Sequence, residues 1–172
     1  MKKVLFMIMA VVFCQSASAQ SFWKTDDCDN FNLIQAGYMS ESGFNGVFAG
    51  YKYGLNITGK KLPLYLEPGA EFHYVSYPNG NGIGLTVPVN VSYKFKTGDF
   101  SISPITGPTF GYSRAWNSDV SGDDFVFGWE FGGRIAYKRI TLSYRYNKVI
   151  TNSILHDVVV WNYHKLAVGF TF

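Results

Sequence analysis

The feature that most constrains this sequence is an alternation of apolar and polar side chains that recurs along most of the chain. Between Ile83 and Phe95, every odd position is apolar or aromatic, whereas the even positions hold Gly, Thr, Pro, Asn, Ser and Lys. Successive side chains of an extended strand point to opposite faces, so a period of two predicts β-strands that each have one apolar face. We therefore expect an all-β chain.

Eight segments show this pattern, with long and short connections between them. We expect strands at residues 31–39, 44–57, 62–75, 83–95, 100–113, 125–138, 140–147 and 165–172. The connections at 76–82, 114–124 and 148–157 are long and polar, whereas those at 96–99 and 138–139 are tight. Alternate long and short connections are typical of an up-and-down antiparallel barrel, with surface loops at one rim and tight turns at the other.

The amino terminus has the pattern of a secretory signal peptide. Lys2 and Lys3 precede an apolar run of about ten residues, and Ala17 and Ala19 form a small-residue cleavage site. The run is about half the length that a membrane-spanning helix needs. We therefore expect three segments: a signal peptide at 1–19, a periplasmic lead segment at 20–30 and a barrel at 31–172.

The charge and the cysteine content exclude two other classes of protein. Of 15 basic side chains, Lys2 and Lys3 fall in the signal peptide, which leaves 13 against 12 acidic ones. A nearly neutral chain without a basic cluster is not expected to bind nucleic acid. Cys28 is the one cysteine that follows the signal peptide, so an internal disulfide framework is excluded as well.

The two faces of the expected strands differ in side-chain size as well as in polarity. One face carries bulky Leu, Val, Ile and Phe, and the other is rich in Gly, Ser, Thr and Ala with a few charges. The interior of an eight-stranded barrel is narrow, so we expect the small polar face inside and the bulky face against lipid. Aromatic residues near the strand ends should form two girdles at the membrane interfaces. The girdle residues are Tyr74, Tyr112, Phe125 and Tyr146 beside the long loops, and Tyr93, Phe95, Phe100 and Tyr137 beside the tight turns.

The end of the chain carries a resemblance to a known family. Apolar residues alternate with others up to a final Phe. This end resembles the carboxy-terminal recognition signal of the small eight-stranded outer-membrane β-barrel proteins, of the OmpX and OmpA transmembrane-domain type, and of the related PorT-like barrels. The resemblance covers residues 31–172 and implies an eight-stranded antiparallel up-and-down transmembrane β-barrel in the bacterial outer membrane. It also implies that the outer-membrane insertion machinery reads Leu166, Val168, Phe170 and Phe172.

The charged residues of the inward face are expected to form a polar network that fills the lumen. If Lys138 and Arg139 form a tight turn, Gly132 lies opposite Arg145, and Glu130 lies diagonal to Arg145 within reach of a salt bridge. An isolated charge in a narrow lumen would cost several kcal/mol, so these ions should pair. The expected lumen residues are Lys52, Glu67, Glu71, His73, Lys94, Glu130, Arg134, Arg145 and Lys165.

The sequence shows no catalytic arrangement. Glu67 and Glu71 lie about 13 Å apart along a strand, too far for two carboxylates that act on one bond. Lipid A deacylases of this fold carry a His and a Ser two residues apart on one strand face, and His73, His156 and His164 have no such Ser. We therefore expect no enzyme activity, no catalytic residues, no metal site and no cofactor.

These patterns together predict an integral component of the cell envelope with a structural, docking or adhesion role. The expected partners are outer-membrane lipid and lipopolysaccharide, with the insertion machinery during biogenesis, and the barrel is expected to be a monomer. A narrow channel for ions or small solutes is the first alternative, and a lipid-A-modifying barrel enzyme is the second. The sequence names no envelope or secretion-complex partner.

Overall fold

The computed structural model describes residues 28–41, 43–77, 80–116, 122–150 and 162–172. These residues form nine strands, which are β1 (Phe31–Glu41), β2 (Phe44–Asn56), β3 (Leu64–Tyr77), β4 (Gly80–Tyr93), β5 (Phe95–Thr97), β6 (Phe100–Trp116), β7 (Gly122–Tyr137), β8 (Ile140–Val149) and β9 (Tyr163–Thr171). The predicted signal peptide, with Ala17 and Ala19, lies outside the described residues, as do residues 20–27 of the predicted lead segment.

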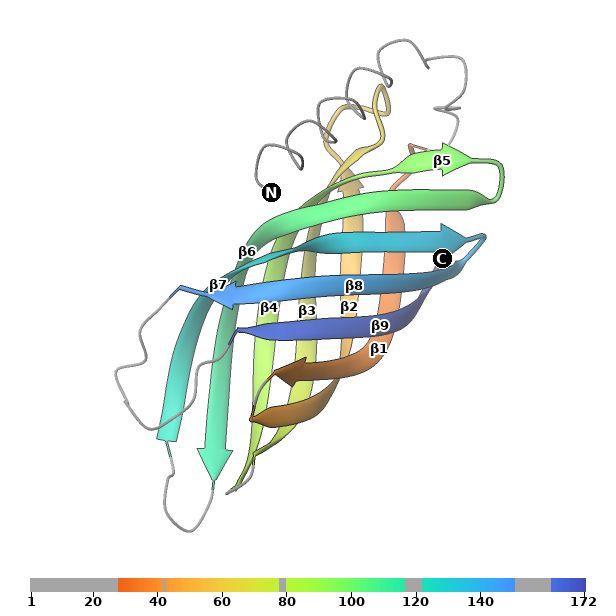
Figure 1. Cartoon of the computed structure of the whole chain (residues 1–172). Coiled ribbons are helices and arrows are strands. Elements are labelled where there is room, and N and C mark those ends of the chain that lie inside the picture. The colour runs from red at the N-terminus through yellow and green to blue at the C-terminus, as the bar shows by residue number, and fades with distance from the viewer. Residues whose placement is uncertain (1–27, 42, 78–79, 117–121, 151–161) are drawn as a thin grey trace, which may run out of the picture.

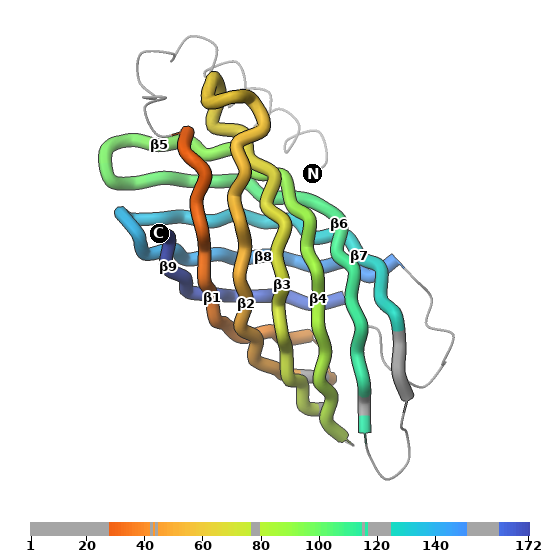
Figure 2. Tube along the Cα trace, turned by 180° about the vertical axis from the view of Figure 1, so that it is seen from behind, coloured from red at the N-terminus to blue at the C-terminus, as the bar shows by residue number. Residues whose placement is uncertain are grey.

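Antiparallel pairing closes these strands into a barrel (Figure 1). Strand β1 pairs with β9, and both β4 and β5 pair with β6. Since β5 continues the path that β4 begins, the nine strands occupy eight positions around the barrel wall, and we call these positions staves. Figure 2 shows the barrel from behind, with β1 to β4 in order and β6 and β7 beside them. The predicted fold class, an eight-stranded antiparallel up-and-down barrel, is confirmed.

The strands are staggered around the barrel. A path that follows register partners once around the barrel does not return to the residue where it began. Starting from Ser40 of β1, it comes back at Asn30, ten residues earlier in the chain and one step past the last register pair of β1 and β2. The register partners on this path are His164, Tyr146, Phe131, Thr106, Val91, Leu66 and Leu55. Stagger and strand tilt are linked in a closed barrel. The tilt brings side chains of strands that are not register partners to the same depth, where they can meet across the lumen.

The two ends of the barrel are unlike. One end, which we call the turn end, holds the turns at 98–99 and 138–139 and the end of β9. Backbone hydrogen bonds join these parts: the Lys138 N–H donates to the Asp99 carbonyl (2.7 Å), and the Thr171 N–H donates to the Arg139 carbonyl (2.8 Å). The other end, which we call the loop end, is where the connections 42–43, 78–79, 117–121 and 150–162 begin and finish.

Two of the predicted long connections are wrong in their bounds. Strands β3 and β4 stay paired out to Tyr77 and Gly80, so residues 76–82 are mostly strand and two residues connect them. Strands β6 and β7 stay paired out to Ala115 and Gly122, which shortens the expected loop at 114–124 to residues 117–121. The prediction took polar composition as the mark of a loop. Backbone pairing does not require apolar side chains, and so the strands continue.

The predicted strand at 83–95 is interrupted at Lys94. The Lys94 N–H donates to the carbonyl of Pro63, which precedes β3 (2.8 Å). Proline has no N–H to return, so the ladder between β3 and β4 ends there. The chain then resumes pairing as β5, with Phe95 opposite Ile102 and Thr97 opposite Phe100.

The apolar faces of the strands point outward, as predicted. Exposed apolar side chains occur on every stave, among them Ile34, Val47, Phe72, Leu85, Phe110, Phe131, Leu142 and Val168. Residues of the opposite parity are buried, and most of these are polar, charged or glycine. No helix among the described residues is long and apolar enough to cross a membrane.

Candidate functional site: the charged lumen

Five charged side chains meet inside the barrel, and we call them the ion belt. They are Lys52 of β2, Glu71 of β3, Glu130 of β7, Arg145 of β8 and Lys165 of β9. None is more than 2% exposed. Because they come from five strands on different sides of the barrel, their contacts cross the lumen.

The two carboxylates of the ion belt share the same cations. Arg145 Nη1 donates to Glu71 Oε1 (2.6 Å) and to Glu130 Oε1 (3.0 Å). Lys165 Nζ donates to Glu71 Oε2 (2.5 Å) and to Glu130 Oε2 (3.2 Å). Lys52 Nζ lies 3.6 Å from Glu71 Oε1 and 3.5 Å from Glu130 Oε1. The predicted salt bridge between Glu130 and Arg145 is therefore one contact of a larger network.

Amide side chains complete the shell around these carboxylates. Gln35 Nε2 donates to Glu71 Oε1 (2.8 Å), and Asn90 Nδ2 donates to Glu130 Oε1 (2.9 Å). Each carboxylate thus has one neutral and several charged partners, which is what buried ions require. Gln35 and Asn90 are not among the predicted lumen residues, although both share the inward parity of their strands.

Inward-facing glycines make room for the long charged side chains. Four belt residues each have a glycine as register partner on the neighbouring strand: Lys52 with Gly69, Glu71 with Gly50, Glu130 with Gly107, and Arg145 with Gly132. The last of these pairs follows the register predicted from the tight turn at 138–139. A Cβ atom on Gly132 would lie 2.1 Å from the Tyr144 carbonyl oxygen, so no larger residue fits there without a shift of the backbone.

A second ion pair lies closer to the turn end. Arg134 Nη1 donates to Glu67 Oε2 (3.1 Å) and Nη2 donates to Glu67 Oε1 (2.5 Å), so the pair is bidentate. The Ser92 hydroxyl also donates to Glu67 Oε1. The Arg134 guanidinium lies 5.2 Å from the centre of the Phe31 ring.

The other two predicted lumen residues are His73 and Lys94. His73 is buried, and its Nε2 atom is 3.4 Å from the Ser113 hydroxyl. Lys94 is half-buried near the turn end, with its Nζ atom 6.0 Å from the centre of the Phe31 ring. The structure therefore brings seven of the nine predicted lumen residues together in two ion groups.

An apolar cluster next to the ion belt was missed in the sequence analysis. Its members are Met39, Phe48, Val75, Tyr163 and Ala167, all buried in the lumen. The Phe48 ring centre lies 5.5 Å from the Arg145 guanidinium and 5.4 Å from Lys165 Nζ, which gives both cations a cation–π contact. The parity of these residues within their strands was the one signal that could have found them.

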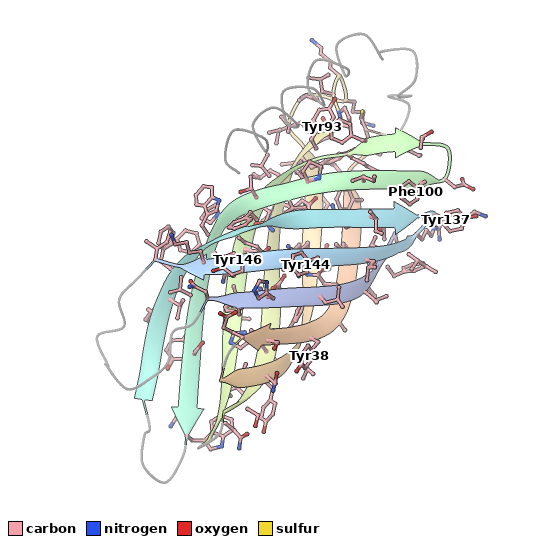
Figure 3. All side chains as sticks on the ribbon, viewed as in Figure 1. Tyr38, Tyr93, Phe100, Tyr137, Tyr144 and Tyr146 are labelled. Carbon is pink, nitrogen blue, oxygen red and sulfur yellow. The ribbon has the colours of Figure 1, made fainter. Side chains whose placement is uncertain are left out.

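Aromatic residues of the outer wall lie toward both ends of the barrel. Figure 3 shows Phe100 and Tyr137 together at the turn end, where they are register partners. Toward the loop end, the rings of Tyr112 and Phe125 are 5.3 Å apart. The remaining predicted girdle residues Tyr74, Tyr93, Phe95 and Tyr146 also lie on the outer wall. So do the four residues of the predicted insertion signal, Leu166, Val168, Phe170 and Phe172, which are exposed.

A polar group on the outer wall was also missed. The Tyr144 hydroxyl and His164 Nδ1 are hydrogen-bonded at 2.7 Å, and His164 Nε2 lies 3.6 Å from a Glu41 carboxylate oxygen. Ser40 is the register partner of His164, and its hydroxyl donates to Asn45. His164 Nδ1 is thus hydrogen-bonded to a group other than Ser40, and Nε2 lies near Glu41 beyond hydrogen-bond distance. The described residues contain no group of three His, Cys, Asp or Glu side chains that could hold a metal ion.

Ion pairs at the turn end are open to solvent. The Lys60 ammonium donates to the Asp29 carboxylate, and this hydrogen bond raises the pKa of Lys60. Lys138 Nζ lies 3.9 Å from Asp99 Oδ2. All four side chains are more than 60% exposed.

Comparisons with known proteins support the fold. The structure is similar to Neisserial surface protein A (TM-score 0.61, 14% identity, covering 83% of this chain and 94% of that one). It is also similar to the N-terminal β-barrel domain of Pseudomonas aeruginosa OprF (TM-score 0.53, 16% identity, covering 83% of this chain and 97% of that one). A third similar structure is the outer membrane enzyme PagL (TM-score 0.56, 9% identity, covering 83% of this chain and 98% of that one). This chain has the fold of the small eight-stranded outer-membrane barrels. No protein-family model matches it, and no curated protein matches it in sequence. The resemblance to PorT-like barrels remains a prediction.

Proposed function

We propose that this protein is an integral component of the bacterial outer membrane, with its turn end in the periplasm and its loop end outside the cell. The apolar outer wall and the outer-membrane barrels of similar structure support this location. Barrels of this class place their short turns on the periplasmic side, which supports the orientation.

The lumen is closed by side chains, and the ion belt is the observation that carries this part of the proposal. Glu71 and Glu130 hold Lys52, Arg145 and Lys165 between opposite walls, and the cluster around Phe48 packs against the belt. An eight-stranded barrel is just wide enough for side chains to fill. A closed barrel leaves its rims and outer wall as the surfaces on which a structural, docking or adhesion role depends.

The engaged state of His164 supports a role without catalysis. A general base needs a free nitrogen within hydrogen-bond reach of its nucleophile. His164 Nδ1 is hydrogen-bonded to the Tyr144 hydroxyl, and the Ser40 hydroxyl donates to Asn45 and not to His164. We infer that this group fastens β1 to β8 and β9 at the loop end.

Ionic current across a planar bilayer tests the proposal. We expect the folded protein, verified by its heat-modifiable migration on gels, to give no discrete conductance steps. Stable steps from the folded protein would overturn the closed lumen and make the ion belt a selectivity filter in a narrow channel.

A further inference from the structure

Basic residues are distributed unequally between the two ends of the barrel. The connections at the loop end, residues 42–43, 78–79, 117–121 and 150–162, contain neither Lys nor Arg, and the strands near that end carry Arg114 and Lys148. The turn end carries Lys60 and Lys61 between β2 and β3, Lys96 in β5, and Lys138 and Arg139 between β7 and β8. We call these five residues the basic collar.

The basic collar has an excess of positive charge and is open to solvent. Lys96 is half-buried, and the other four residues are exposed. The carboxylates described at this end are Asp29 and Asp99, each paired with one collar lysine. Five cations against two carboxylates leave a formal charge of +3. Exposed pairs of this kind are weak, so the paired lysines also remain able to bind another anion.

The basic collar follows directly on aromatic residues of the outer wall. Lys138 Nζ lies 5.6 Å from the centre of the Tyr137 ring, and Tyr137 is the register partner of Phe100. Figure 3 shows both rings at the turn end. Apolar wall, aromatic ring and cation thus follow one another in the order of hydrocarbon, interface and headgroup phosphate in a lipid leaflet.

The collar cations are also spread around the barrel. They come from the β2–β3 connection, from β5 and from the β7–β8 connection, which lie at different places around the barrel. A single acidic protein would be expected to meet one patch of charge, whereas lipid surrounds the whole circumference. The distribution therefore favours lipid as the partner.

We propose that the basic collar binds the phosphate groups of anionic phospholipids in the leaflet at the turn end. This proposal rests on the proposed function, which places that end in the periplasmic leaflet. Lysine and arginine side chains at a membrane surface attract anionic lipid by roughly fivefold in affinity per cation, and salt weakens this attraction.

The test is the preference of the folded barrel for spin-labelled phosphatidylglycerol over spin-labelled phosphatidylcholine, measured by electron spin resonance in phosphatidylcholine vesicles. We expect the wild-type protein to prefer phosphatidylglycerol about fivefold or more. The double variant Lys138→Gln with Arg139→Gln should lose at least half of this preference, and the variant with all five collar residues changed to Gln should lose it. Arg114→Gln with Lys148→Gln is the matched control, because it removes two cations from strands near the loop end and should keep the wild-type preference.

Two results would overturn the proposal. One is equal binding of the two lipids by the wild-type protein, which would leave an acidic protein as the occupant to seek. The other is an equal loss of preference in the control and in the collar double variant. Heat-modifiable migration verifies that each variant is folded. Current across a bilayer would reject the closed lumen without affecting the lipid preference, so the two proposals fail separately.

Discussion

The ion pairs inside the barrel and those at its turn end both join a basic side chain to a carboxylate, but their surroundings are opposite. The belt side chains are at most 3% exposed, whereas those of Lys60, Asp29, Lys138 and Asp99 are 63–69% exposed. The attraction between two charges grows as the surroundings become less polar, and so does the cost of leaving one of them alone. The belt ions therefore cannot lose a partner without a large cost in free energy, whereas the turn-end cations can exchange partners at little cost.

The largest expected effect is the loss of one belt carboxylate. Glu130→Ala leaves Arg145, Lys165 and Lys52 with Glu71 as their one shared anion, so the free energy of unfolding should fall by about 3–5 kcal/mol. Urea unfolding of the folded protein in lipid vesicles, followed by gel migration, measures this change. The control is Asp99→Ala, which removes a carboxylate from an exposed pair; an equal loss in both variants would contradict the comparison.

The bidentate pair of Glu67 and Arg134 tests whether the cost comes from an unpaired charge. Arg134→Met alone should lower the free energy of unfolding by about 3 kcal/mol, because Glu67 is left buried without its main partner. Arg134→Met combined with Glu67→Met should restore most of this loss, to within about 1 kcal/mol of the wild type. Equal losses in the single and the double variant, by the same urea titration, would show that shape and not charge governs this site.

The glycines opposite the belt residues give a smaller effect. Gly132→Ala would place its Cβ atom against the backbone of Tyr144 and Arg145, and we expect a loss of about 1–3 kcal/mol. Gly133→Ala is the matched control, because the nearest atom to its Cβ would be the Ser103 carbonyl oxygen at 3.7 Å. Equal stability of the two variants would mean that the lumen has spare room.

The smallest effect is expected at the turn end. Lys60→Gln and Lys138→Gln each break an exposed ion pair, and neither should change the unfolding midpoint measurably. A midpoint shift as large as that of Gly132→Ala would show that the turn-end pairs stabilise the fold and are not free to exchange partners.

The sequence predicted which residues face inward far better than how they pair. Parity along a strand is local, so the inward direction of Glu71 or Arg145 could be read from a period of two. The contact between Glu71 and Lys165 joins residues 94 positions apart, and it depends on the stagger of the closed barrel. Gln35 and the Phe48 cluster were missed for the same reason, since their role depends on what faces them across the lumen.

Strand ends were harder to predict than strands. The register around the turn at 138–139 follows from a two-residue turn, and the structure has it. The ladder ends at Lys94 because Pro63, which lies 31 residues earlier in the chain, has no N–H to donate. The pairing of Tyr77 with Gly80 joins polar segments that lack the apolar alternation. In both places backbone hydrogen bonding overrides side-chain pattern.

Arg145 offers the most direct test of the central claim, that the ion belt is a structural plug whose charges stabilise the barrel and not a gate. The measurement is the free energy of unfolding and the bilayer current of the same Arg145→Ala protein, with Thr141→Ala as a control for a neutral inward residue on β8. We expect a large loss of stability and no discrete current from the protein that remains folded. A variant that keeps its stability and gains stable conductance steps would contradict this claim and identify Arg145 as a gate.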